Sequence, residues 1–190
     1  LQALLARAVD LSFNRVTVDS DTSTSDTVLL FATGATDVGD ISDPEDPRLD
    51  AFRDLLQSVA RDLAHQIVRD GEGATKFVTV TVTGAEDERA ASRIALAIGN
   101  SPLVKTMIAA EDANWGRLVM AVGKAGEAAD RDRLRIWIGE EQAAEGGKMR
   151  AGYSEERATA FLKEPEITLR ADVGVGDGEA TIWTCDLTHG

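Results

Sequence analysis

Glu72 lies between two glycines in a short polar segment, Gly71-Glu-Gly-Ala-Thr-Lys76, whose residue types suit the binding of a charged ligand. The segment connects a helix expected to end at Asp70 with a strand expected to begin at Phe77. Glycines let the backbone pass close to a ligand, and connections beside strand ends are favoured positions for ligands. Glu72 is therefore a candidate for binding a substrate ammonium group by a charge-assisted hydrogen bond. The alternative, a solvated loop acid, is favoured on local grounds.

A run of short polar side chains begins at Asp19. The spacing Asp19-x-Asp21-x-Ser23 is that of the start of a calcium loop, because hard cations take oxygen ligands at alternate positions. The loop's glycine is replaced by Thr24 and its bidentate carboxylate by Leu30. The Asp-x-Asp pair also fits the nucleophile loop of phosphate-transferring enzymes, but no later pair of acids would hold magnesium. A turn whose side chains satisfy backbone groups is favoured, and no metal site is predicted.

Two further patterns carry little chemistry. Gly174-x-Gly176-x-Gly178 is followed by a strand, whereas a phosphate cradle needs the start of a helix, so a hairpin is favoured. His65 lies within a predicted helix and His189 lies near the end of the sequence, so their spacing supports no Ser–His–Asp relay.

Asp112, Asn114 and Arg117 surround Trp115 within six residues. Such a density of polar groups beside an indole indicates a fixed network. The sequence does not separate a structural network from part of a pocket, and it favours the structural one. Cys185 is interpreted as a small buried hydrophobe at a strand end.

Regular elements must position these groups. Alternation predicts a strand over Phe77–Thr83, with valines on one face and threonines on the other. Spacings of three and four predict a helix after Pro47 that buries one apolar stripe, made of Leu49, Phe52, Leu56, Val59, Leu63 and Ile67. We also expect helices over residues 1–9, 86–98 and 154–162, and strands over residues 16–18, 27–31, 134–138, 167–173 and 180–185. Residues 16–31 are expected to form a hairpin-like loop, and the last two strands a hairpin.

Composition excludes several classes of partner. The formal net charge of −13 repels phosphate backbones and anionic lipids, so neither nucleic acid nor membrane is expected as a partner. The single cysteine excludes an internal disulfide and fits a reducing compartment. No apolar run approaches the ~20 residues that span a bilayer, and we expect a cytoplasmic protein. The sequence starts inside an amphipathic pattern without methionine, which predicts a preceding segment.

Six segments together resemble the second subunit of the ornithine acetyltransferase (glutamate N-acetyltransferase) family. They occur in the family's order and span nearly the whole chain. The segments are Ser12-Phe-Asn-Arg15, Val18-Asp-Ser-Asp-Thr-Ser-Thr-Ser-Asp-Thr27, Gly71-Glu-Gly-Ala-Thr-Lys76, Asn100-Ser-Pro-Leu-Val-Lys-Thr106, Asp112-Ala-Asn-Trp-Gly-Arg117 and Cys185-Asp-Leu-Thr188.

The resemblance implies transfer of an acetyl group from N2-acetyl-L-ornithine to L-glutamate, a reaction of arginine biosynthesis. In this family a precursor cleaves itself before a threonine, whose hydroxyl takes the acetyl group. That threonine is expected upstream of Leu1, so the resemblance assigns no catalytic residue to this chain, and Glu72 is its substrate-binding residue. The expected partner is the alpha chain of the same precursor, in an assembly of two alpha and two beta chains. No cofactor or metal is implied, and acetyl-CoA stays open as an alternative donor.

The implied fold class is α/β, a layered sandwich of the N-terminal-nucleophile type. Residues 1–84 are expected to belong to the catalytic sandwich shared with the alpha chain, and residues 85–190 to form a smaller α+β domain. Two alternatives stay open. One is a related self-cleaving aminopeptidase or amidase, which gives the acyl group to water. The other is a non-catalytic subunit of the same fold, which a precursor without the threonine would indicate.

Overall fold

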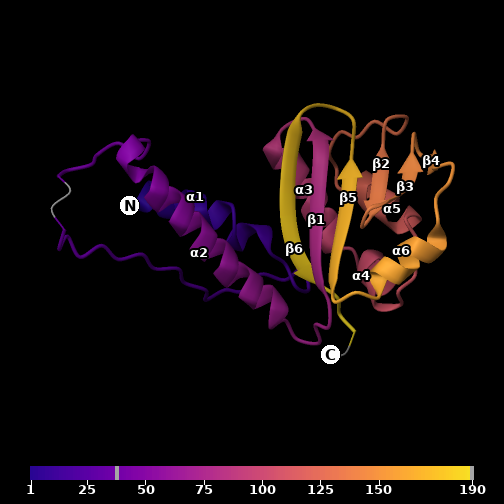
Figure 1. Cartoon of the computed structure of the whole chain (residues 1–190), viewed down its shortest axis with the longest axis horizontal. Helices are drawn as coiled ribbons and strands as arrows, with labels where there is room; N and C mark the ends of the chain where they lie inside the picture. Colours follow the sequence, from indigo (N-terminus) through magenta and orange to yellow (C-terminus); the bar gives the residue numbers. More distant parts are fainter. Residues whose placement is uncertain (37–38, 189–190) are drawn as a thin grey trace.

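The computed structural model describes residues 1–36 and 39–188, and its core is a mixed sheet with strand order β4-β3-β2-β5-β1-β6 (Figure 1). The predicted α/β class is confirmed. The strands are β1 (Phe77–Ala85), β2 (Arg135–Ile138), β3 (Glu141–Glu145), β4 (Lys148–Met149), β5 (Glu166–Asp172) and β6 (Gly178–Cys185). The helices are α1 (Gln2–Asp10), η1 (Phe13–Arg15), η2 (Pro47–Leu49), α2 (Asp50–Arg69), α3 (Glu88–Gly99), α4 (Pro102–Ala109), α5 (Gly116–Lys124) and α6 (Glu155–Leu162).

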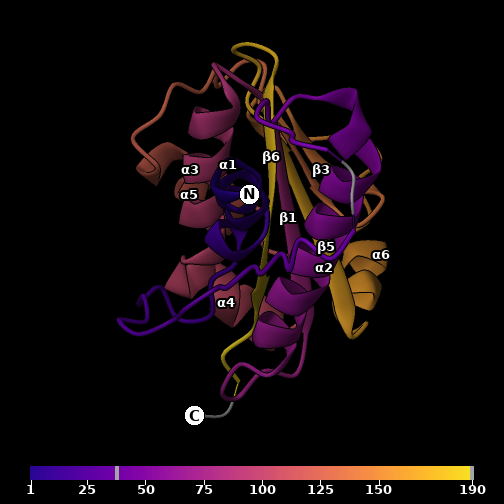
Figure 2. The ribbon, with the colours of Figure 1, turned by 90° about the vertical axis from the view of Figure 1, so that its left-hand side faces the viewer.

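Helices lie on both faces of the sheet. Seen along the edge of the sheet, α3, α4 and α5 cover one face, whereas α6 and the end of α2 lie on the other (Figure 2). Among the described residues, no helix is long and apolar enough to cross a membrane.

Strand β1 has the alternation that the sequence predicts. Val78, Val80 and Val82 are fully buried in the main hydrophobic core, together with Ile94 and Ile98 of α3. The threonines between these valines are half-buried on the opposite face of the sheet. Strand β1 pairs in parallel with β5 and antiparallel with β6, so it lies between these two strands.

The predicted hairpin of the last two strands is wrong. Strands β5 and β6 run in opposite directions, but β1 lies between them and takes the hydrogen bonds of both. The connection therefore crosses the end of β1, where the N–H groups of Val175 and Gly176 donate to the carbonyl oxygen of Gly84 at 2.6 and 2.8 Å. The domain boundary predicted after residue 84 falls at the end of β1, within this sheet, and the division into two domains stays a prediction.

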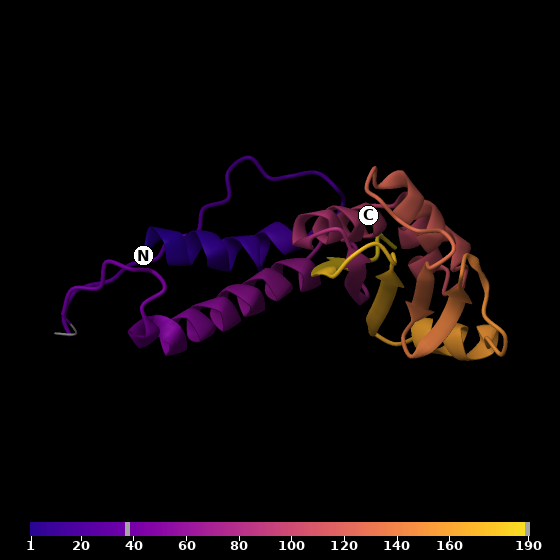
Figure 3. The ribbon, with the colours of Figure 1, turned by 90° about the horizontal axis from the view of Figure 1, so that it is seen from above.

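Helix α2 is present as predicted, but the burial of its apolar stripe is wrong. The buried residues of α2 are the small Ala60 and Ala64 and the C-terminal Val68. Most of the larger apolar side chains are exposed, and Leu56 is half-buried, because α1 and α2 project beyond the β6 edge of the sheet (Figure 3). The exposed apolar stripe of α2 comprises Phe52, Leu55, Val59, Leu63 and Ile67.

The predicted strand pair around the polar run is also wrong. Val16 forms an isolated parallel bridge with Trp183 of β6, and the N–H of Thr17 donates to the carbonyl oxygen of Trp183 at 3.1 Å. Residues 27–31 form no strand. Residues 16 and 17 thus pair with the edge strand β6 and not with residues 27–31.

Helix caps fix several of the elements that surround the core. The side chains of Asp87, Ser101 and Ser154 accept hydrogen bonds from main-chain N–H groups at the starts of α3, α4 and α6. Helices α1, α3 and α6 are confirmed within one or two residues, as are β2, β5 and β6. The sequence analysis missed α4, α5, β3 and β4.

Candidate functional site

The Glu72 loop lies at the end of the sheet where β1 begins and β6 ends (Figure 1). Gly71 packs so tightly here that an added Cβ would lie 3.1 Å from Cγ1 of Val18 and 3.2 Å from Sγ of Cys185. The N–H of Thr188 reaches the carbonyl oxygen of Gly73 at 3.5 Å. Segments from the start, the middle and the end of the chain therefore meet around this loop.

Glu72 itself is exposed on the loop. In the described part of the chain, its carboxylate has no hydrogen bond and no ion pair. Gly73 follows it with a φ of 72°, a conformation that favours glycine. The side chain is thus presented to solvent by a backbone that is held on both sides. Its role as a substrate-binding residue stays a prediction.

Asp186 holds the second half of this loop. Its carboxylate is fully buried and accepts hydrogen bonds of 2.7 Å from the N–H and the hydroxyl of Thr75 and from the N–H of Lys76. The hydroxyl of Thr188 also donates to it. Burial by itself would raise the pKa of Asp186, but these hydrogen bonds outweigh burial and lower the pKa. The carboxylate is therefore ionised and accepts all four donors.

Lys105 of α4 reaches the end of β6, next to Asp186. Its side chain is 5% exposed, and its ammonium donates to the hydroxyl of Thr184 at 3.0 Å and to the carbonyl oxygen of Cys185 at 2.7 Å. Burial lowers the pKa of Lys105, whereas Cys185, Asp186 and Asp19 act to raise it. A buried cation of one element thus fixes the last residues of β6.

The sequence analysis gave neither Lys105 nor Asp186 a role, although both lie within segments that carry the family resemblance. A signal exists for the lysine. It lies in a mostly apolar stretch, residues 103–110, where a charged side chain must find buried partners or leave the core. Asp186 has no comparable local signal, because Thr75 and Lys76, which supply three of its four donors, lie more than a hundred positions earlier in the chain.

The group around Trp115 forms contacts between helices. Arg117 donates to the carbonyl oxygen of Leu103 at 3.0 Å and to the hydroxyl of Thr106 at 2.8 Å, and it lies 3.8 Å from the carboxylate of Asp112. The half-buried indole of Trp115 packs against the main core. These contacts join α4 to α5, which supports the structural interpretation. Asn114 is exposed in the connection between the two helices.

The polar run after Val18 satisfies its own backbone. Asp19 accepts from the N–H of Asp21 at 2.9 Å, and Ser23 accepts from the N–H of Ser25 at 3.4 Å. Within residues 1–36 and 39–188, no cluster of three or more His, Cys, Asp or Glu residues could hold a metal ion. These contacts are those of the turn that the sequence favours. The absence of a metal requirement stays a prediction, and His189 lies outside the described residues.

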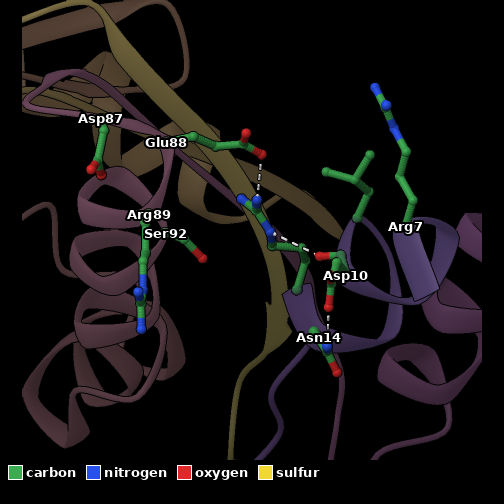
Figure 4. Close-up of a pocket in the computed structure, with 9 residues that line it drawn as sticks. Arg7, Asp10, Asn14, Asp87, Glu88, Arg89 and Ser92 are labelled. Carbon is green, nitrogen blue, oxygen red and sulfur yellow. Dashed lines mark hydrogen bonds and ion pairs between the residues drawn. The ribbon is translucent and has the colours of Figure 1, made fainter. Parts of the chain in front are cut away.

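A hollow at the other end of the sheet does not include the predicted site residue. A space of about 930 Å³ opens between α1 and the start of α3, with charged side chains along its walls (Figure 4). Arg15 donates to Glu88 at 2.6 Å and to the carbonyl oxygen of Asp10 at 3.1 Å, and Asn14 donates to Asp10 at 2.7 Å. These groups satisfy one another and hold α1 to α3. We therefore place the candidate site at the Glu72 loop.

Fold and site together define a mixed α/β protein whose exposed carboxylate, unpaired among the described residues, lies on an anchored loop at the end of the central strands. The model of the ArgJ family matches residues 1–190, so the chain belongs to the ArgJ family. It is 60% identical over 191 residues to the arginine biosynthesis bifunctional protein ArgJ of Mesorhizobium japonicum and 60% identical over 192 residues to that of Rhizobium meliloti. Each alignment covers 99% of this chain but 46% of the relative, so the chain spans about half the length of these curated relatives.

A crystal structure of the arginine biosynthesis bifunctional protein ArgJ from Bacillus halodurans is similar throughout. Its TM-score is 0.92 at 40% sequence identity, and the match covers 99% of this chain and 88% of that chain. The fold described above is thus the fold of a solved member of the family.

Proposed function

We propose that this chain is the C-terminal part of an acetyltransferase that moves an acetyl group from N2-acetyl-L-ornithine to L-glutamate in arginine biosynthesis. The observation that carries the proposal is the family match over residues 1–190, with relatives named as arginine biosynthesis proteins at 60% identity. Acetyl-CoA is kept as an alternative donor. The enzyme works in the cytoplasm, and we propose that it needs neither a metal nor a cofactor.

The proposed chemistry uses a threonine upstream of Leu1 as the first residue of a self-cleaved chain. An N-terminal amine has a pKa of about 7.7–8.0, so its neutral form can accept the proton of the threonine hydroxyl. The hydroxyl oxygen attacks the acetamide carbonyl, the C–N bond breaks, and ornithine leaves after its nitrogen takes the proton. The amino group of glutamate then attacks the acetyl ester. The C–O bond of the ester breaks, N-acetylglutamate forms, and the threonine hydroxyl is restored.

Glu72 binds the amino acid portion of the substrate in this proposal. Two features support the assignment. The carboxylate is exposed and unpaired within the described residues. The loop that carries it is held by Cys185, which packs against Gly71, and by Asp186, which accepts hydrogen bonds from Thr75 and Lys76. A fixed loop loses little further freedom when a ligand binds, so more of the contact energy appears as affinity. A hydrogen bond to a charged group contributes about 1.5–3 kcal/mol.

The remainder of the precursor is proposed as the partner, in an assembly of two alpha and two beta chains. Lengths support separate chains: curated relatives extend over about twice this sequence, whereas the crystallised chain from Bacillus halodurans is only slightly longer than it. The surface supports a partner as well. Val28 and Leu29 lie beside Leu63 and Ile67 of the exposed apolar stripe of α2, and such an exposed apolar surface marks an interaction site.

Steady-state kinetics of the assembled enzyme with Glu72→Gln test the function and the site together. The substitution keeps the shape and removes the charge. We expect kcat/KM for N2-acetyl-L-ornithine to fall about ten- to a hundredfold, since every ~1.36 kcal/mol is a factor of ten. Self-cleavage and the melting temperature should not change.

Glu140→Gln is the matched control, because Glu140 is also an exposed acid next to a positive-φ glycine, in the β2–β3 turn. It should leave kcat/KM unchanged. A normal kcat/KM for Glu72→Gln would rule out the binding role, and a lowered melting temperature would make Glu72 structural. Activity that a chelator removes and one divalent ion restores would contradict the metal-free proposal.

The alternatives differ in the acceptor of the acetyl group. An acetyltransferase releases ornithine in proportion to the glutamate supplied and forms N-acetylglutamate. A related aminopeptidase or amidase would release ornithine and acetate without glutamate. A non-catalytic subunit would release neither product, and its precursor would lack the threonine.

A further inference from the structure

The Glu72 loop and the residue after β6 are joined by an unusually complete set of contacts. Asp186 is fully buried, and three of its four donors belong to Thr75 and Lys76, which form the end of the loop. Each of these three hydrogen bonds is 2.7 Å long, a distance typical of charge-assisted bonds. One carboxylate therefore holds the main chain of the loop's second half, while the ammonium of Lys76 also donates to Glu111 and to the carbonyl oxygen of Leu162.

The first half of the loop depends on the same strand end. Gly71 packs against Sγ of Cys185, the residue before Asp186, and Gly73 accepts from the N–H of Thr188, two residues after it. Both glycines that flank Glu72 are thus in contact with residues 185–188, while the Glu72 side chain forms no hydrogen bond or ion pair with any described residue. A short chain segment that is held at both ends has few ways to move its central side chain.

The strand end is in turn held from α4. The ammonium of Lys105 bonds the carbonyl oxygen of Cys185 at 2.7 Å, directly before Asp186. Lys105 does not approach the loop through any hydrogen bond or ion pair in the described residues. Its contribution is to fix the backbone from which the carboxylate of Asp186 extends.

We propose that Asp186 is a positioning residue for substrate binding, which acts through Glu72 by holding the loop that presents it. The proposal rests on the proposed binding role of Glu72. Asp186→Asn removes the negative charge that strengthens all four hydrogen bonds, and its Nδ2 cannot accept from the hydroxyls of Thr75 and Thr188, so the hold on the loop is weakened. The loss is expected in affinity and not in the chemical step.

The test is a double-mutant cycle on the assembled enzyme with Glu72→Gln, Asp186→Asn and both together. Asp186→Asn should lower kcat/KM for N2-acetyl-L-ornithine about tenfold through KM, and weaken ornithine binding in calorimetry to the same extent. In the background of Glu72→Gln, it should cost less than about twofold, because the group that it positions is already gone. Equal losses in both backgrounds would overturn the proposal.

Asp172→Asn is the matched control. Asp172 also accepts from a main-chain N–H, that of Gly174 at 3.0 Å, but it lies at the opposite end of the sheet strands. It should leave KM and ornithine affinity unchanged. An equal loss of affinity in this control would show a general effect of stability and overturn the positioning role.

Thr75→Val keeps the test decisive if Asp186→Asn does not fold. It removes one donor to Asp186 and leaves both main-chain N–H groups in place. A smaller loss of affinity, absent in the Glu72→Gln background, is expected, and unchanged affinity would overturn the proposal. A normal Glu72→Gln enzyme would instead show that the proposed role of Glu72 fails, which is a different outcome.

Discussion

The imidazole ring of His65 packs edge-on against the indole of Trp183, with ring centroids 4.4 Å apart and ring planes at 62°. The same imidazole lies 5.1 Å from the ring of Phe77. Nε2 of His65 is buried and has no hydrogen-bond partner among the described residues. Through this cluster, α2 is attached to β1 and β6 by a titratable ring among aromatic ones.

The stability of the chain should therefore depend on pH between neutral and mildly acidic conditions. Burial, together with the charges of Arg69 and Arg61, lowers the pKa of His65, although Asp62 and Glu166 oppose the shift. Below about pH 6.5, His65 binds a proton in the unfolded chain but not in the folded chain. The free energy of unfolding therefore decreases as the pH decreases, until the pH reaches the lowered pKa of His65 in the folded chain.

Urea unfolding of the wild type and of His65→Phe measures this dependence. The variant keeps a ring in the cluster and removes the titration. The free energy of unfolding of the variant should therefore rise relative to that of the wild type as the pH falls below about 6.5. A constant difference over this range would contradict the prediction.

Gly84 should be intolerant of a side chain. Its φ is 70°, and an added Cβ would overlap Oδ1 of Asp172 and lie 2.9 Å from the nitrogen of Gly174. Gly84→Ala should lower the free energy of unfolding by about 2–4 kcal/mol. Gly123→Ala is the control. Gly123 lies in α5, and a Cβ added there would have no neighbour within 4 Å. This substitution should raise the free energy of unfolding by about 0.5–1 kcal/mol. Similar results for both glycines would contradict the prediction.

The exposed apolar stripe of α2 should bind the remainder of the precursor. Leu63 and Ile67 are 46% and 51% exposed, so replacing both by serine removes little packing within this chain. Association with the partner, measured by titration of the separately produced chains, should weaken at least about tenfold. The stability of this chain alone should change by less than about 0.5 kcal/mol per substitution.

Met149→Ser is the matched control for this surface. Met149 is 65% exposed on β4, at the opposite edge of the sheet from α2. It should leave association unchanged. A larger effect of this control than of the α2 variant would place the partner elsewhere.

Local order in the sequence determined which segments are regular. The valine–threonine alternation predicted β1, and the spacing of apolar residues predicted α2 and α3, because each pattern depends on neighbours within a few positions. The combination of six segments predicted the family, and the family match agrees with it. Glu72 was identified from the two glycines beside it and from the resemblance.

The tertiary structure alone decided what these elements contact. The periodicity of α2 marks an apolar face but not the surface that covers it, so the stripe from Phe52 to Ile67 was wrongly expected to be buried. The strand order was likewise hidden, because β5 and β6 are consecutive and yet separated by β1. The anchoring of the Glu72 loop by Asp186 joins residues more than a hundred positions apart. Such contacts depend on how the strands are ordered in the sheet, and no local pattern of residues encodes that order.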